Sequence, residues 1–238
     1  MNAVFQQAIL IIDTLLVGGL GEEALVAMGI AASISAFILG IVFALANGAQ
    51  ILIAQAHGAC SKPAVKSGFW SGLLVGLTVA LIGVLVVVVL HQPIVGALAK
   101  TSVIAEMTSS YLLIFTIAIV GIAISQNISV YFYSTGRPKL PFYSKVVELP
   151  VNAFISWVLI YGLVGFPALG LQGAAIGSAI AVLLRALFLV SALVWSNQHF
   201  LLNAQWLGGS FLLAIKRHLK NALPIAGTFI SMNMSFSV

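Results

Sequence analysis

Hydrophobic residues in this chain gather in long, nearly unbroken runs that are separated by short polar turns. Six runs approach or exceed the ~20 residues that a helix needs to cross roughly 30 Å of hydrocarbon, and a seventh begins near the end. Strands of a membrane barrel would instead alternate over segments of about 10 residues. We therefore predict an all-α integral membrane protein, a six-transmembrane-helix bundle plus the start of a seventh helix. The expected spans are Ala3–Gly18, Ala31–Ala54, Phe69–Leu90, Tyr111–Tyr133, Val146–Leu163, Ala174–Trp195 and Leu223 onward.

Turns rich in glycine, proline and charge separate these runs, as at Gly19–Glu23 and Ser134–Pro141. The stretch His91–Ser110 is longer and partly amphipathic, so we expect it to lie along the outer membrane surface. The longest polar interruption is Asn197–Asn221. Its Ile215–Lys220 segment is basic on one side and apolar on the other, which is typical of an interfacial helix that connects and anchors.

These features divide the chain into three parts. Residues 1–196 are expected to form a six-helix lobe, residues 197–221 a cytoplasmic connector, and residues 222–238 the start of the seventh helix. A six-span unit begins and ends on the same side of the membrane, so a second copy after the connector would have the same orientation, as parallel transporter repeats do. Both ends look cut, and we expect the chain to be a fragment, about half of a longer protein.

Composition agrees with the membrane assignment. Hydrophobic residues make up 61% of the chain and charged residues 6%, and the mean hydropathy is +1.17, which excludes a water-soluble domain. The first run is not a signal peptide, because it lacks a basic leader and a small-residue cleavage site and carries Asp13.

Charge is distributed unevenly between alternate loops. One set of loops holds eight basic residues, and the other set holds one, Lys100, together with Glu22, Glu23 and Glu106. This positive-inside pattern predicts a multi-pass protein of the cytoplasmic (inner) membrane with a cytoplasmic amino terminus. A nucleic-acid partner is not expected, since the positive charge is explained by topology. The eight basic residues are Lys62, Lys66, Arg137, Lys139, Lys145, Lys216, Arg217 and Lys220.

Signatures of enzymes and of metal sites are absent from the sequence. The four histidines have no metal-ligand spacing and fall in expected loops, and the single cysteine, Cys60, excludes an internal disulfide and a cysteine-based metal site. We predict that the chain is not an enzyme and holds no resident metal or cofactor. The histidines are His57, His91, His199 and His218.

Asp13 is the most informative single residue. It lies inside the first apolar run, and an ionisable group at membrane depth costs at least a few kcal/mol, so it usually faces a cavity and has a function. A carboxylate that can be neutral or charged is a candidate proton-coupling group. The alternative is a structural role, with Arg185 as the only basic partner nearby.

Other polar groups at depth fall in the fifth and sixth runs. Asn152 and Ser156 are four residues apart and therefore share one helix face; Asn152 could also serve only to hold helices together. Glu148 lies close to its helix start, and snorkelling to the interface is the simplest account of it. Arg185 either pairs with Glu148 or backbone carbonyls, or acts on substrate or as a counter-ion.

Several ordered motifs resemble the amino-terminal half of multidrug and toxic compound extrusion (MATE) transporters. They run through nearly all of the chain, and their order and spacing are more specific than any one alone. The motifs are Asp13–Gly21, Ala24–Gly29, Gly48–Ala59, Ser134–Lys139, Pro150–Asn152, Ile160–Gly162 and Leu169–Ala175.

This resemblance implies one lobe of a twelve-helix exporter that moves amphipathic or cationic small molecules in exchange for H+ or Na+ and requires the carboxy-terminal lobe as its partner. Asp13, Asn152 and Ser156 would then couple ion and substrate in the cavity. Relatives often carry asparagine or aspartate where this chain has Ser156, and an acidic residue near Met232 or Asn233, neither of which is acidic here. Both departures weaken the case for a metal-cation site, so H+ coupling through Asp13 is favoured. Further candidates for lining the substrate cavity are Gln50, Gln55, Gln126, Asn127 and Arg185.

Two other functions remain open from the sequence. A lipid-linked oligosaccharide flippase of the same superfamily would be expected to carry more basic residues in its cavity. A non-transporting membrane scaffold or remnant would use the polar residues only to pack helices.

Overall fold

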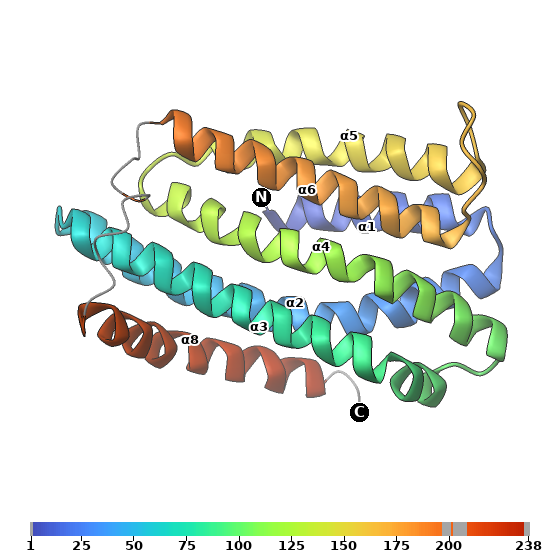
Figure 1. Cartoon of the computed structure of the whole chain (residues 1–238), viewed down its shortest axis with the longest axis horizontal. Helices are drawn as coiled ribbons and strands as arrows, with labels where there is room; N and C mark the ends of the chain where they lie inside the picture. Colours follow the sequence, from blue (N-terminus) through green and yellow to red (C-terminus); the bar gives the residue numbers. More distant parts are fainter. Residues whose placement is uncertain (1, 197–200, 202–208, 236–238) are drawn as a thin grey trace. The chain divides into compact units, whose positions relative to one another are not determined.

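The structure is a computed structural model that describes residues 2–196, 201 and 209–235, and these residues form helices joined by short turns (Figure 1). No strand occurs among the described residues, so the all-α prediction is confirmed. The helices are α1 (Asn2–Gly18), α2 (Glu22–Gly58), α3 (Lys62–Leu98), α4 (Ser102–Ser134), α5 (Lys139–Tyr161), α6 (Leu171–Trp195) and α8 (Gly209–Ser235).

Helices α1 to α6 correspond to the six predicted spans. Five of them, α2 to α6, are long and apolar enough to cross a membrane, and α1 contributes a shorter apolar segment, Gln7–Gly18. Apolar side chains cover these helices on all sides, as expected of segments surrounded by lipid and by other helices. The chain is therefore a multi-pass membrane protein built on a helical bundle.

The segment His91–Ser110 is almost entirely helical, and its expected position along the outer membrane surface stays a prediction. Helix α3 continues through Pro93 to Leu98, and α4 begins at Ser102, so only residues 99–101 separate the two helices. Packing explains the difference, because Val95 is fully buried and Ile104 is also buried. Burial of these side chains stabilises the end of α3 and the start of α4 as helix. The lower average hydropathy of this stretch gave no sign of such contacts.

The histidines also lie elsewhere than expected. His57, His91 and His218 are in helices α2, α3 and α8, not in loops, and His199 lies outside the described residues. In the described part of the chain, no three His, Cys, Asp or Glu side chains are grouped so that they could hold a metal ion.

Helix α8 runs without interruption through the expected boundary between connector and seventh span at 221–222, with Pro224 inside it. Residues 197–200, 202–208 and 236–238, which belong to the predicted connector and seventh span, lie outside the described residues. The buried ring of His218 donates from Nε2 to the Leu45 carbonyl of α2, at 2.8 Å. One turn later, Ala222 packs directly on Gly48. The polar segment is therefore docked on α2.

The described helices fall into two compact units. Helix α1 belongs to the first unit and α8 to the second, and α2 to α6 contribute to both. The first unit comprises Met1–Ala36, Ile82–Gly121 and Phe142–Arg185, and the second Phe37–Leu81, Ile122–Pro141 and Ala186–Val238.

The core of the second unit is rich in aromatic and branched side chains. The Trp70 indole donates to the Leu201 carbonyl at 2.7 Å, and the Phe69 and Tyr131 rings meet edge to face with centroids 5.4 Å apart. The main buried residues are Ala49, Ile53, Phe69, Ile128, Tyr131, Phe132, Leu189 and Leu193.

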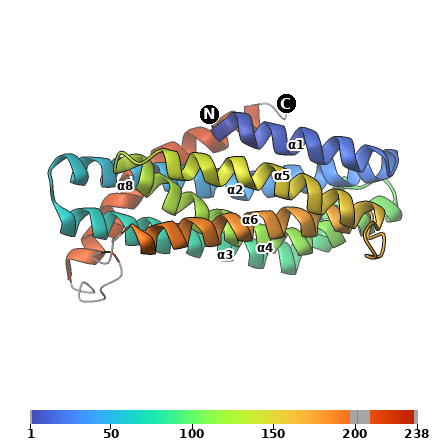
Figure 2. The same cartoon turned by 90° about the horizontal axis from the view of Figure 1, so that it is seen from above.

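In the first unit, α5 and α6 approach closely because of two glycines four residues apart. Helices α5 and α6 lie side by side in both views of the chain (Figure 1 and Figure 2). A Cβ at Gly173 would lie 2.6 Å from the Leu159 carbonyl carbon, and one at Gly177 would lie 2.8 Å from the Ser156 Cα. Small residues at this spacing let membrane helices pack backbone to backbone. This contact presses Ser156 against α6.

Gly173→Ala is expected to destabilise this helix pair, because overpacking forces the backbone apart at a cost of about 1–3 kcal/mol. The midpoint of thermal unfolding in detergent should fall. The matched control is Gly29→Ala, since a Cβ there meets nothing within 4 Å, and it should leave the midpoint unchanged or raise it through better helix propensity. Equal midpoints for both variants would contradict the close contact.

Candidate functional site

Asp13 is buried on α1, with 7% of its surface exposed. Its partner is a serine that the sequence analysis did not single out. The Ser178 hydroxyl on α6 donates to Asp13 Oδ2 at 3.2 Å, and Asn152 Nδ2 on α5 donates to the Ser178 oxygen at 2.9 Å. Three helices therefore meet at one hydrogen-bonded chain. We call Asp13, Asn152, Ser156 and Ser178 the carboxylate site.

Local packing holds these helices in register. At the end of α5, the Tyr161 hydroxyl donates to the Leu16 carbonyl of α1 at 2.8 Å. The glycine contacts described above fix α5 against α6. The buried phenol of Tyr111 on α4 also lies within electrostatic reach of the Asp13 carboxylate.

Three buried oxygens of the carboxylate site have no hydrogen-bond partner among the described residues. They are Asp13 Oδ1, Asn152 Oδ1 and Ser156 Oγ. A buried polar atom without a partner costs about 1–3 kcal/mol, and in native proteins it is explained by a functional role, by strain, or by a bound water or ion. The arrangement can accept a proton or surround a small cation with oxygen.

The structure links Asp13 to Asn152 through Ser178 and places Ser156 one turn further along α5, and the coupling role of these residues stays a prediction. Ser178 was missed because a lone serine in an apolar run is indistinguishable from a packing residue. Its only signal was its position inside the span, next to Gly177.

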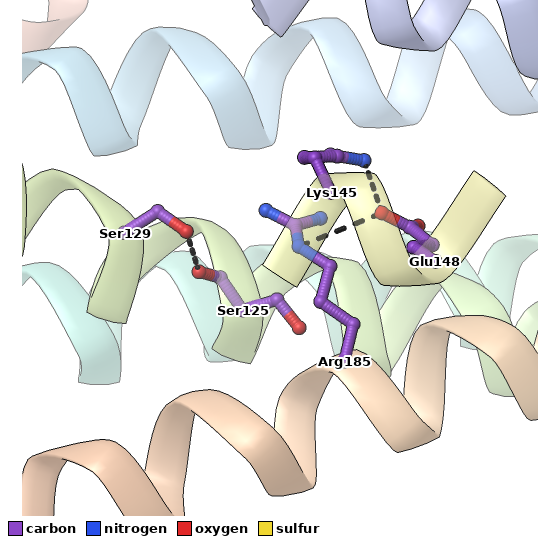
Figure 3. Close-up of polar contacts among 5 residues, drawn as sticks. All are labelled: Ser125, Ser129, Lys145, Glu148 and Arg185. Atoms are coloured by element: carbon purple, nitrogen blue, oxygen red, sulfur yellow. Dashed lines mark hydrogen bonds and ion pairs between the residues drawn. The ribbon is translucent and has the colours of Figure 1, made fainter. Parts of the chain in front are cut away.

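A second buried polar group in the first unit consists of Lys145, Glu148 and Arg185, which we call the charged cluster (Figure 3). Glu148 Oε2 lies 2.6 Å from Lys145 Nζ and 3.6 Å from Arg185 Nε. All three residues are buried. Of the two alternatives for Arg185, the pair with Glu148 is the one that the structure contains.

Two expectations about this cluster are wrong. Lys145 was expected in a cytoplasmic loop and Glu148 was expected to snorkel, yet both are buried within α5, which begins at Lys139. Mutual pairing is the physical reason, because a carboxylate held by two cations no longer needs to reach water. With two cations and one anion, the cluster carries a net positive charge.

The remaining candidates for the substrate cavity lie in the second unit. Gln55 is exposed, and Gln50 and Gln126 are half-buried. Asn127 is buried, and its Nδ2 donates to the Phe69 carbonyl at 3.2 Å. The part of these four side chains in substrate binding stays a prediction.

Comparison with known proteins decides the family. The MatE family model matches residues 1–158, which is more than half of the chain. The chain belongs to the MatE family. Members of this family are transporters rather than enzymes, which agrees with the prediction from the sequence.

Curated relatives of this MatE chain carry the name "Probable multidrug resistance protein NorM". The protein from Streptococcus pneumoniae strain R6 is 31% identical over 236 residues, which cover 95% of this chain and 50% of the relative. The protein from Burkholderia pseudomallei is 28% identical over 189 residues, which cover 79% of this chain and 40% of the relative. The chain thus spans about half the length of the curated relatives it matches.

Solved structures show the same fold. A MATE protein in the bent conformation superposes with a TM-score of 0.85 at 20% identity, over 98% of this chain and 51% of that one. A transporter of the MOP superfamily from Pyrococcus furiosus superposes with a TM-score of 0.84 at 18% identity, over 98% and 51% of the two chains. These matches confirm the fold class and the resemblance to half of a MATE transporter.

Proposed function

We propose that this MatE chain forms one lobe of an antiporter that exports amphipathic or cationic compounds across the cytoplasmic membrane in exchange for protons. The relatives' names, which refer to multidrug resistance, support the substrate class. The observation that carries the coupling role is the buried Asp13 carboxylate, with one oxygen held by Ser178 and the other without a partner. Alternating access needs two lobes, so the proposal includes a carboxy-terminal lobe as partner.

The coupling step is a protonation at Asp13 Oδ1. The proton removes the charge of the carboxylate and turns this oxygen from an acceptor into a donor. The unpartnered oxygens of Asn152 and Ser156 on α5 then become possible acceptors. A new bond from α1 to α5 would rearrange these helices and release a cationic substrate. Loss of the proton restores a negative charge that attracts the next cation.

Protons are favoured over Na+ because the carboxylate site supplies one carboxylate and neutral oxygens only. Hard metal cations prefer sets of several oxygen ligands, often with more than one carboxylate. A serine at position 156 adds no charge. The unpartnered oxygens still offer Na+ some coordination, so the two ions must be compared directly.

The orientation of the chain is part of the proposal. Its support is the distribution of charge, since seven basic residues other than the buried Lys145 lie near the α2–α3 and α4–α5 turns or on α8, against Lys100 near the α3–α4 turn. On this basis we propose a cytoplasmic amino terminus.

The direct test uses the complete protein in proteoliposomes loaded with a fluorescent cationic dye. An imposed pH gradient without Na+ should drive dye movement, and a Na+ gradient at constant pH should not. Dye movement that follows only the Na+ gradient would overturn proton coupling, and no movement under either gradient would overturn the exporter.

Ser178→Ala tests how the site is held together. It leaves Asp13 Oδ2 and Asn152 Nδ2 without the partner that joins them, and we expect it to lower stability by about 1–3 kcal/mol. Ser33→Ala is the control, since that exposed hydroxyl bonds only its own helix at Gly29. The measurement is thermal unfolding in detergent. Ser178→Thr keeps the hydroxyl and should therefore keep most of the stability that Ser178→Ala loses.

An oligosaccharide-lipid flippase is the second candidate. The observation that favours it is the net positive charge of the buried cluster, to which Lys145 adds a second cation beside Arg185. Both cations contact Glu148, which reduces their attraction for an anionic substrate. The two candidates are separated by measuring dye movement in the same vesicles with a soluble pyrophosphate-linked sugar added. The sugar should slow dye movement only if the protein has a flippase site.

A further inference from the structure

A cavity opens in the second unit where α2 ends, α3 begins and α4 ends. Its volume is about 310 Å³. Its lining includes the cationic side chains Lys62 and Arg137, the imidazole of His57, and the hydroxyl-bearing residues Ser61 and Thr135. We call it the basic cavity. Neither the carboxylate site nor the charged cluster contributes a residue to it.

Backbone geometry fixes the first wall of the basic cavity. Helix α2 ends in a Schellman turn, in which the Ser61 amide donates to the Ala56 carbonyl at 3.0 Å and the Cys60 amide to the His57 carbonyl at 2.9 Å. Cys60 takes a left-handed conformation with φ of 54°. The Ser61 carbonyl then accepts from Val65, so α3 starts at once and Lys62 stands at its first turn.

The opposite wall is built in the same way at the end of α4. The Arg137 amide donates to the Phe132 carbonyl at 2.8 Å, across Gly136 with its φ of 75°. The Thr135 hydroxyl donates to the Tyr131 carbonyl at 2.9 Å. Arg137 is therefore held beside the cavity by a closed turn, although its side chain is exposed.

The charge of the basic cavity is uncompensated. No Asp or Glu is among its lining residues, and neither Lys62 nor Arg137 forms an ion pair within the part of the chain that is described. The planar guanidinium and the ammonium group are the side chains that bind phosphate best. An anion with several acceptor oxygens fits this set of donors.

The surroundings indicate where such an anion comes from. Two buried side chains, the apolar Val65 and the aromatic Tyr131, also line the cavity. It lies at the ends of three membrane-spanning helices, on the side of the chain that carries the excess of basic residues. Anionic lipids attract basic segments at this level of the membrane, and basic pockets between helices bind lipid head groups. We propose that the basic cavity binds the phosphate group of an anionic phospholipid.

Cys60 provides a reporter for this proposal. It is the only cysteine of the chain, it is exposed, and it lines the cavity. The chain is reconstituted in nanodiscs of phosphatidylcholine, with or without phosphatidylglycerol, and the rate of labelling by an uncharged maleimide is measured. At ten times the half-saturating lipid fraction, labelling should be about tenfold slower with phosphatidylglycerol, because a bound head group covers the thiol.

Paired variants separate binding from a general surface effect. In Lys62→Gln/Arg137→Gln, the ratio of rates between the two lipid compositions should approach one. Lys216→Gln removes an exposed basic residue of α8 that does not line the cavity, and it should keep the wild-type ratio. Equal labelling in both lipids, or protection that survives the double variant, would overturn the proposal.

A last arm distinguishes lipid from free phosphate. Inorganic phosphate is added to nanodiscs of phosphatidylcholine alone, and we expect it to leave the labelling rate unchanged. Protection by inorganic phosphate equal to that by phosphatidylglycerol would assign the cavity to a soluble anion and overturn the lipid as its occupant.

Discussion

Asp13→Asn is expected to abolish proton-driven export while leaving the protein folded. Asparagine has the size of aspartate and can still accept from Ser178, but it cannot take up and release a proton. Dye efflux from proteoliposomes under an imposed pH gradient should therefore fall to the rate of protein-free vesicles. Substrate binding without a gradient should weaken but persist, because the carboxylate site loses one negative charge while its side chains keep their size.

The control for this variant is the neighbouring residue. Thr14 is exposed, and its hydroxyl bonds only the Leu10 carbonyl of its own helix, at 2.7 Å. Thr14→Val should transport like the wild type. The thermal unfolding midpoint of Asp13→Asn should equal or exceed that of the wild type, since the variant removes the cost of burying a charge. Normal proton-driven efflux by Asp13→Asn would exclude this residue as the coupling group.

Glu148→Gln is expected to have the largest effect on stability. It removes the carboxylate that contacts both Lys145 and Arg185, and these two buried cations lose that countercharge. Breaking a buried ion pair on one side costs about 3–5 kcal/mol, a large part of the 5–15 kcal/mol that stabilises a typical protein. A much lower unfolding midpoint in detergent, or loss of the folded protein during purification, is the expected result.

Two further variants make this prediction specific. Glu106→Gln changes an exposed glutamate of α4 and should leave the midpoint unchanged. The triple change Lys145→Met, Glu148→Gln and Arg185→Met removes every charge of the cluster and should recover much of the stability, because buried ion pairs are often replaceable by apolar side chains. A Glu148→Gln protein as stable as the wild type would show that the cluster is not closed to water.

The fold was largely predictable from the sequence, for a simple physical reason. A membrane span must be apolar over about 20 residues, and this requirement is visible without knowledge of contacts. Helix ends were predicted less well. The expected fifth span began at Val146, whereas α5 begins at Lys139, because Lys139 and Lys145 lower the local hydropathy before Val146. Pairing inside the bundle compensates the charges of Lys145 and Glu148, and a one-dimensional pattern does not contain such pairing.

The carboxylate site was predictable only in part. Asp13 and Asn152 stand out because polar groups at depth are rare. Ser178 does not, since which residues of α1, α5 and α6 meet depends on the rotation of each helix. A helix that is apolar on all sides carries no periodic signal of its rotation. The contact is set instead by the two glycines of α6, whose role became clear only from the approach of the α5 backbone.

The docking of α8 has a mechanical consequence. His218 and Ala222 are one helical turn apart, and they contact Leu45 and Gly48, which are also one turn apart on α2. Two contacts on parallel rows fix both the rotation and the sliding of α8. A flexible connection would leave the segments on its two sides free to move independently. Because α8 is held by the His218–Leu45 and Ala222–Gly48 contacts, we expect a tilt of this part of α2 to move α8 with it.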